Sequence, residues 1–277
     1  MKKKLFILGL VMAFCKIFSA GVWAEERIIV QNDSPYNGMS YEEFSQAIRD
    51  EMEMSEEFQK HKADDPGGAE EALQESIDKS WEIYLMDDSS LVNTRTVNAA
   101  QTNGWVNATN VQQKNSYYCG PATVLNAIAG WGGYVAGSTN IAKQDTLANR
   151  MGTNSSEGTY VYQVKNALNA YLNSPTNQHR YDYVLGSSMT TTTFLNAMRT
   201  MFPYDRSLIL HARTAPLSYY NGADYHHYIL VTAFNTLNGK TRLNDPHWNN
   251  SYYGIRSVPT SEALATVKNY SGRYLIW

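Results

Sequence analysis

A single cysteine, Cys119, remains in this chain once an expected export signal is removed, so no internal disulfide is expected to hold the fold together. The remaining length is enough for one well-packed domain plus an appendage. A lone thiol of this kind is either an inert buried side chain or a reactive one. An apolar run that predicts a helix follows directly, and the positive end of a helix dipole favours thiolate over thiol. The context therefore favours a reactive Cys119.

Residues 1–24 have the pattern of a signal peptide. A basic start precedes an apolar run over 5–20 that only Lys16 interrupts, and a small-x-Ala site ends at Ala24. A retained membrane anchor is the alternative, but the run is short for a span of about 20 residues. Cys15 would leave with the signal. We expect a secreted, extracellular protein without a membrane segment after cleavage, and association with the cell wall is one option for its location.

The two halves of the mature chain differ in charge. Residues 25–100 hold 19 acidic and 6 basic side chains, whereas residues 101–277 hold 7 acidic and 13 basic ones. The halves should attract each other. Basic charge suits anionic partners such as wall polymers, but no Arg/Lys cluster is interleaved with aromatics, so nucleic-acid binding is not expected. We predict that residues 25–100 are an acidic pro-region that inhibits the second half, or else a stabilising extension.

Helical signals organise this acidic segment. An apolar stripe predicts a helix over 41–58, with Ser40 as its N-cap and Glu43 as the capping-box partner. Residues 63–68 contain Asp, Pro and Gly and are expected to form a turn or linker. A second apolar stripe predicts a helix over 69–86.

Helical and strand signals alternate in residues 101–277, with helices first and strands clustered late. This order is typical of an α+β architecture. Helices are expected at 122–131, 146–151, 161–172 and 190–201, and strands at 181–185, 207–211, 227–234 and 241–244.

Four residues of this half supply the groups that cysteine-based acyl transfer needs. Cys119 is the candidate nucleophile, and His227, at the start of a strongly β-prone run, is the candidate base. Asp245 follows the next strand and is suited to accept one ring proton of His227, which would fix the tautomer. Gln113 is suited to donate its side-chain amide to a developing oxyanion, with the backbone N–H of Cys119 as second donor.

The order Gln-x5-Cys-Gly-Pro-Ala, then His before a strand, then Asn-Asp-Pro resembles the papain-like cysteine peptidases of the bacteriocin-processing, double-glycine peptidase family. The likeness covers roughly residues 105–277 and is greatest to secreted, stand-alone members without a transporter domain. Residues 144–153 and Gly158-Thr159 are similar to the segment between Cys and His. The resemblance implies a papain-like fold, with an N-terminal helical part carrying the Cys helix and a C-terminal antiparallel sheet carrying His and Asp. It also implies a Cys-His-Asp triad and a glutamine in the oxyanion hole.

Neighbouring residues compete for each role. The alternative for Cys119 is a structural thiol. The substitutes for the other roles are His226 as the base, Asn244 or His247 as the orienting group, and Gln112 as the oxyanion donor. His179 and His211 are expected to be structural, and no cluster has the spacing of a metal site.

Gly67-Gly68 suggests self-processing, because double-glycine peptidases cut after such a pair. The family's leaders present apolar residues at several fixed positions before the cut, whereas this chain has Asp65, Lys62 and Glu57 there. A flexible linker is the simpler interpretation.

The sequence therefore predicts a secreted, monomeric cysteine peptidase that acts on peptide or protein substrates and needs no cofactor or metal. One alternative is a cell-wall amidase or acyl transferase with the same triad. The other is an inactive binding or adhesion module.

Overall fold

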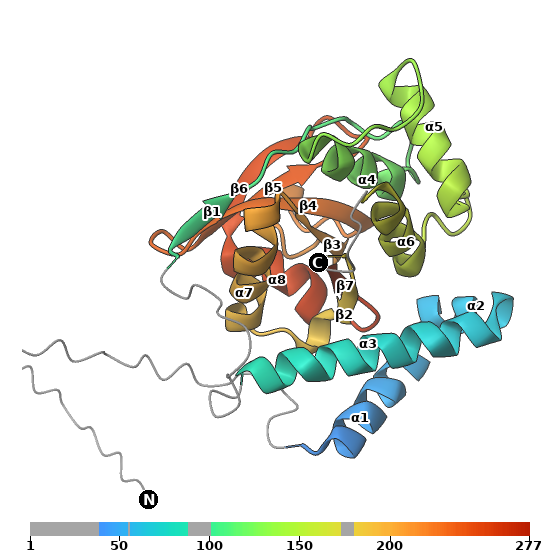
Figure 1. Ribbon diagram of the computed structural model, residues 1–277, viewed down its shortest axis with the longest axis vertical. Coiled ribbons are helices and arrows are strands. Elements are labelled where there is room, and N and C mark those ends of the chain that lie inside the picture. The colour runs from blue at the N-terminus through green and yellow to red at the C-terminus, as the bar shows by residue number, and fades with distance from the viewer. Residues whose placement is uncertain (1–38, 55, 88–100, 173–179) are drawn as a thin grey trace, which may run out of the picture. The chain divides into compact units, whose positions relative to one another are not determined.

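The computed structural model describes residues 39–54, 56–87, 101–172 and 180–277 (Figure 1). The expected signal peptide at 1–24 and His179 lie outside these ranges. Within them, no helix is long and apolar enough to cross a bilayer.

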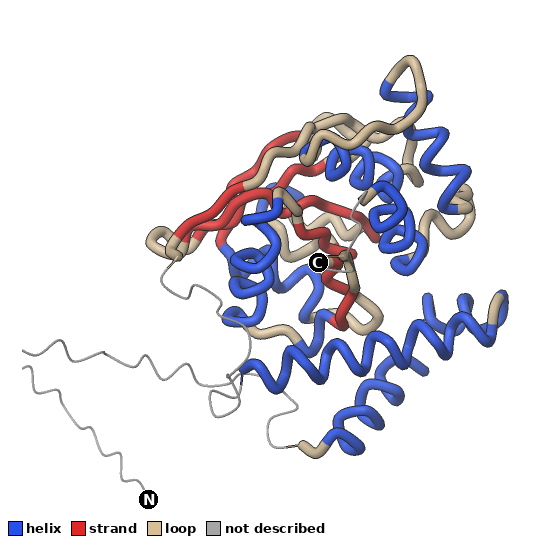
Figure 2. Tube along the Cα trace, in the orientation of Figure 1, coloured by secondary structure: helices blue, strands red, loops and turns tan. Residues whose placement is uncertain are grey.

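An antiparallel sheet of seven strands is central to residues 101–277 (Figure 2). Six strands follow the order β2-β7-β3-β4-β5-β6, and the short β1 pairs with the second part of β4. The strands are β1 Asn103–Trp105, β2 Tyr183–Leu185, β3 Leu208–Arg213, β4 His226–Asn235, β5 Lys240–Asp245, β6 Gly254–Pro259 and β7 Tyr274–Ile276. The α+β prediction is confirmed, although β1, β6 and β7 were not predicted.

The longest strand, β4, is rich in aromatic and β-branched residues, which suit a pleated, buried surface. It turns into β5 through Asn238-Gly239, where Gly239 has a φ of 63° and Asn238 Oδ1 accepts the Lys240 N–H at 3.1 Å. The register that this turn sets holds as far as Ala233 opposite Arg242, and a shift between Val231 and Ala233 then places Leu230 opposite Asn244. The ends of β4 and β5 farthest from the turn are thereby brought together.

Helices pack on this sheet, with α7 beside α8 in Figure 1. They are α4 Cys119–Gly130, α5 Asn140–Met151, α6 Val161–Tyr171, α7 Thr191–Met201 and α8 Thr260–Lys268, with short 3₁₀ turns η1 Gly186–Ser188, η2 Phe202–Tyr204 and η3 Ser218–Tyr220. Helix α4 is buried from Cys119 to Ile128 and contacts β4, where Thr123 Oγ1 donates to the Tyr228 carbonyl at 2.9 Å. Its apolar sequence thus reflects burial on all sides.

The N-terminal segment forms α1 Tyr41–Glu53, α2 Glu56–Asp64 and α3 Pro66–Asp87. The predicted capping box of Ser40 and Glu43 is present. A single helix over 41–58 is wrong, because α1 ends at Glu53 and a new helix begins at Glu56.

The expected linker over 63–68 is also wrong. Helix α2 runs to Asp64, and α3 begins with Pro66, whose fixed φ suits the first helical position. Asp65 Oδ1 accepts the Gly68 N–H at 3.0 Å, as an N-cap does. The two glycines therefore lie in the first turn of a helix rather than in a flexible linker.

Helices α1–α3 share one hydrophobic core with the second half of the chain. Ile77 is fully buried in α3, which packs against β2 and α7. Tyr183 Oη donates to the Ala72 carbonyl at 3.2 Å, and Ser80 Oγ accepts the Leu185 N–H at 3.2 Å. These contacts are the kind that hold a domain together.

Ion pairs join described residues of the N-terminal helices to the second half of the chain. In the ion pair of Lys165 with Glu75, the basic residue belongs to the second half and the acidic residue to the first, as the charge distribution predicts. In the ion pair of Lys60 with Glu157, at 3.4 Å, the basic residue instead belongs to the first half. The expected attraction of an acidic first half for a basic second half therefore has support from the Lys165 pair and not from the Lys60 pair.

Candidate active site

Cys119 is the first residue of α4 and is 9% exposed. Gly120 brings the start of this helix close to Thr159, since a Cβ on Gly120 would lie 2.6 Å from Thr159 Oγ1. Pro121 occupies the first turn, where backbone N–H groups have no helical partner to lose. The Gly-Pro sequence after Cys119 thus fits a helix start that is packed tightly against a neighbouring loop.

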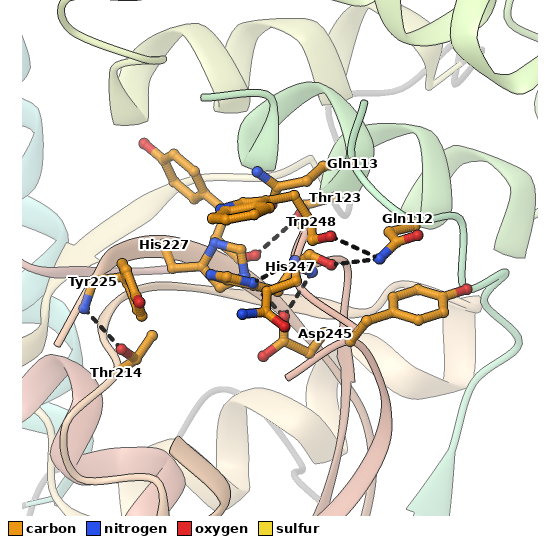
Figure 3. A network of polar contacts seen from close by, with 12 residues as sticks. Gln112, Gln113, Thr123, Thr214, Tyr225, His227, Asp245, His247 and Trp248 are labelled. Atoms are coloured by element: carbon orange, nitrogen blue, oxygen red, sulfur yellow. Dashed lines mark hydrogen bonds and ion pairs between the residues drawn. The ribbon is translucent and has the colours of Figure 1, made fainter. Parts of the chain in front are cut away.

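His227 lies at the second position of β4 and Asp245 at the last position of β5, and both are buried. Their side chains meet, with His227 Nε2 at 2.8 Å from Asp245 Oδ1 (Figure 3). Cys119 lies close enough to the same ring to raise its pKa. Because Asp245 occupies Nε2, the nitrogen left for Cys119 is Nδ1. The structure therefore brings three of the predicted residues into one row.

Charge within this row favours a protonated imidazole. Burial lowers the pKa of His227, but the negative charge and hydrogen bond of Asp245 outweigh burial, and Cys119 adds to their effect. Together they raise the pKa from 6.5 to about 9. At neutral pH, the ring is therefore an imidazolium, which places a positive charge beside the Cys119 sulfur.

Asp245 is fully buried and receives four hydrogen bonds. Its Oδ1 accepts from His227 and from the His247 N–H at 2.9 Å, and its Oδ2 accepts from the Tyr219 and Tyr220 hydroxyls, each at 2.8 Å. Burial raises the pKa of Asp245, but the charge of His227 and these donors hold it below its ordinary value. The carboxylate is thus ionised and fixed in orientation.

The two tyrosines are site residues that the sequence analysis missed. They belong to η3, and burial followed by the charge of Asp245 raises the pKa of both well above the ordinary 10. Both hydroxyls therefore remain protonated donors. No local pattern singles out Tyr219 and Tyr220 among 20 tyrosines.

Gln113 is 5% exposed and lies beside the loop that follows Asp245 (Figure 3). Its N–H donates to the Pro246 carbonyl at 2.7 Å, and its Nε2 donates to the Asn115 carbonyl at 2.5 Å. A primary amide has two N–H donors, so one remains for a ligand. Gln112 Nε2 instead donates to the carbonyls of His247, at 3.2 Å, and Trp248, at 3.0 Å. Of the two glutamines, Gln113 has the donor to spare.

The residues that are alternatives for the roles of base and orienting group have other partners. His226 is exposed and contacts Arg213 at 3.0 Å. Asn244 Oδ1 accepts from Thr232 at 2.9 Å. His247 Nδ1 accepts a backbone N–H, while burial and then the charge of His227 lower the pKa of His247 to about 4. His247 is therefore neutral next to the charged His227.

His211 is buried in the sheet. Its ring stacks on Tyr228, with centroids 4.7 Å apart, and its Nε2 contacts Arg273 at 2.8 Å. These contacts agree with the structural role expected for it.

A family model described as the Peptidase_C39 like family matches residues 106–274, which include the four candidate site residues. No curated protein matches significantly. Among solved structures, one that matches is described as the crystal structure of a double glycine motif protease from AMS/PCAT transporter in complex with the leader peptide. Its TM-score is 0.34 and its identity 14%, over 62% of this chain and 91% of that chain.

Proposed function

Because the chain belongs to the Peptidase_C39 like family, it is a cysteine peptidase with a papain-like α+β fold, and we propose that it hydrolyses peptide bonds with Cys119 as nucleophile. The observation that carries this assignment is the buried hydrogen bond of His227 to Asp245, with Cys119 close enough to the same ring to raise its pKa. A nucleophile, a base and an orienting carboxylate in contact are what acyl transfer requires.

In the proposed reaction, the Cys119 sulfur attacks the carbonyl carbon of the scissile bond, forming a C–S bond and an oxyanion. The free N–H of Gln113 and the backbone N–H of Cys119 stabilise that oxyanion. His227 gives its Nδ1 proton to the leaving amine as the C–N bond breaks. Water then hydrolyses the thioester, with the neutral ring accepting a proton from water and returning it to the thiol.

Asp245 acts by holding His227. It fixes Nε2 as the protonated nitrogen, so that Nδ1 faces the reacting sulfur, and it stabilises the imidazolium. Its four hydrogen bonds support this role, because they leave the carboxylate no other orientation that satisfies its oxygens.

The test is mass spectrometry of peptides released from a denatured proteome by the wild type and by Cys119→Ala. We expect new peptide ends from the wild type alone, and their sequences define the substrate preference. Equal release by both proteins would refute the assignment. Soluble muropeptides from purified walls, without proteome cleavage, would instead identify a cell-wall amidase.

We further propose that residues 1–24 direct secretion and that residues 41–87 remain as structural support rather than as an inhibitor. The shared core and fully buried Ile77 support this view of α1–α3. Sequencing the N-terminus of the exported protein is the test. A start at Glu25 is expected, whereas a start near Ala100 would show that the helices are removed.

A further inference from the structure

Gln144 is a buried polar side chain of α5 whose amide pairs at both ends with the main chain. It is 1% exposed. Its Nε2 donates to the Gln112 carbonyl at 2.9 Å, and its Oε1 accepts the Lys114 N–H at 2.9 Å. The side chain thus satisfies two backbone groups in the way that a neighbouring strand would.

The residue between those two backbone groups is Gln113. Its own N–H donates to the Pro246 carbonyl, on the loop after Asp245. The segment 112–114 is therefore held from two sides, by Gln144 of α5 and by the Asp245 loop.

Segment 112–114 belongs to no helix or strand, so no regular hydrogen-bond ladder fixes it. An oxyanion donor nevertheless needs fixed geometry, because its advantage over water lies in being oriented before the reaction starts. Supporting residues must hold such a donor to within about 0.5 Å. Gln144 is placed to do this for Gln113.

We propose that Gln144 is a positioning residue that aims Gln113 at the oxyanion. This rests on the proposed function, in which Gln113 is the oxyanion donor. A merely structural Gln144 would support folding without a specific effect on steps that form an oxyanion.

Two small probes separate these roles without knowledge of the peptide substrate. N-Acetylglycine p-nitrophenyl ester acylates the Cys119 sulfur through an oxyanion, as the C–S bond forms and p-nitrophenolate leaves with the electrons of the C–O bond. Iodoacetamide alkylates the same sulfur by displacing iodide, and no oxyanion forms. The ratio of the acylation rate to the alkylation rate therefore measures stabilisation of the oxyanion separately from the reactivity of the Cys119 sulfur.

Gln144→Met removes both hydrogen bonds at similar side-chain length. Gln144→Glu keeps an acceptor for Lys114 but, when ionised, has no donor for Gln112. We expect each variant to slow acylation about tenfold, which is less than the loss caused by removing an oxyanion donor altogether. The rate of alkylation should stay within about twofold of the wild-type rate. Thr146→Val is the matched control, because Thr146 lies on α5 but donates to the Ala136 and Ala142 carbonyls. It should change neither rate.

The decisive comparison adds Gln144→Met to Gln113→Ala. If Gln144 acts through Gln113, the double variant acylates no more slowly than Gln113→Ala alone. A further loss there, an unchanged acylation rate in both single Gln144 variants, or equal loss of acylation and alkylation would overturn the proposal. If Gln113→Ala itself leaves acylation unchanged, the oxyanion role of Gln113 fails first, and the positioning role fails with it.

Discussion

The Tyr220 hydroxyl donates to Oδ2 of Asp245 at 2.8 Å, on the opposite side of the carboxylate from His227. The Tyr220 ring also stacks on Tyr252, with centroids 4.3 Å apart. The hydrogen bonds from the Tyr220 and Tyr219 hydroxyls let the fully buried Asp245 carboxylate stay ionised while it orients the His227 imidazole.

Replacing both tyrosines by phenylalanine is expected to weaken catalysis and to shift its pH dependence. A hydrogen bond to a charged group contributes about 1.5 kcal/mol or more, so we expect kcat/KM to fall at least about tenfold. Without these donors the pKa of Asp245 rises, so the acid limb of the pH profile of kcat/KM should move to higher pH. Tyr204→Phe, at an exposed site, is the control. An unshifted acid limb in the double variant would show that the hydroxyls do not support Asp245.

The raised pKa of His227 makes stability depend on pH. The pKa is about 9 in the folded protein against 6.5 for an ordinary histidine. The contribution of His227 is therefore fully present below pH 6.5 and is lost as pH rises through about 9. Urea unfolding midpoints of the wild type should fall between pH 6 and pH 9.5, more than those of Asp245→Asn, which lacks the charge responsible. Parallel profiles of the two proteins would contradict this.

Helices α1–α3 are expected to unfold together with the rest of residues 39–277. Ile77→Ala removes a fully buried side chain and should cost about 2–5 kcal/mol of unfolding free energy. The loss should appear in a single transition that coincides with the loss of activity. Ile141→Ala is the matched control, because Ile141 is 54% exposed. A separate early transition with activity retained would mean that the helices are an independent appendage.

Gly120→Ala should disturb the start of α4. The added Cβ would lie 2.6 Å from Thr159 Oγ1 and 2.8 Å from its Cβ, and overpacking of this kind costs about 1–3 kcal/mol. We expect lower stability and lower activity, both partly restored by Thr159→Gly. Gly67→Ala, in the open first turn of α3, should be neutral or stabilising, by up to about 1 kcal/mol. Thermal unfolding and kcat/KM measure both effects, and an unaltered Gly120→Ala protein would refute the tight contact.

The sequence predicted those parts of the fold that have strong local signals. The β-prone run after His227 became β4, and the apolar run after Cys119 became α4. The three-residue strand β7 carries no such signal, because its pairing partners β2 and β3 lie far away in the chain. Gly67-Gly68 was misassigned as part of a linker because glycine marks turns statistically, whereas Asp65 and Pro66 start a helix here.

For the candidate site, the sequence identified residues with motif context but not their supports. In the structure His227 hydrogen-bonds to Asp245 and Cys119 lies beside the ring, while the chemical roles of all three stay predictions. Tyr219, Tyr220 and Gln144 were missed as supports because each acts through space on a partner more than two dozen residues away.

The central claim is that Cys119 reacts because His227 and Asp245 activate it. The most direct measurement is the rate at which a peptidyl epoxide labels Cys119 at neutral pH, followed by mass spectrometry. We expect stoichiometric labelling of the wild type, and labelling about a hundredfold slower or more in His227→Ala, the size of effect typical for loss of a general acid–base group. Equal labelling rates in the two proteins would contradict it.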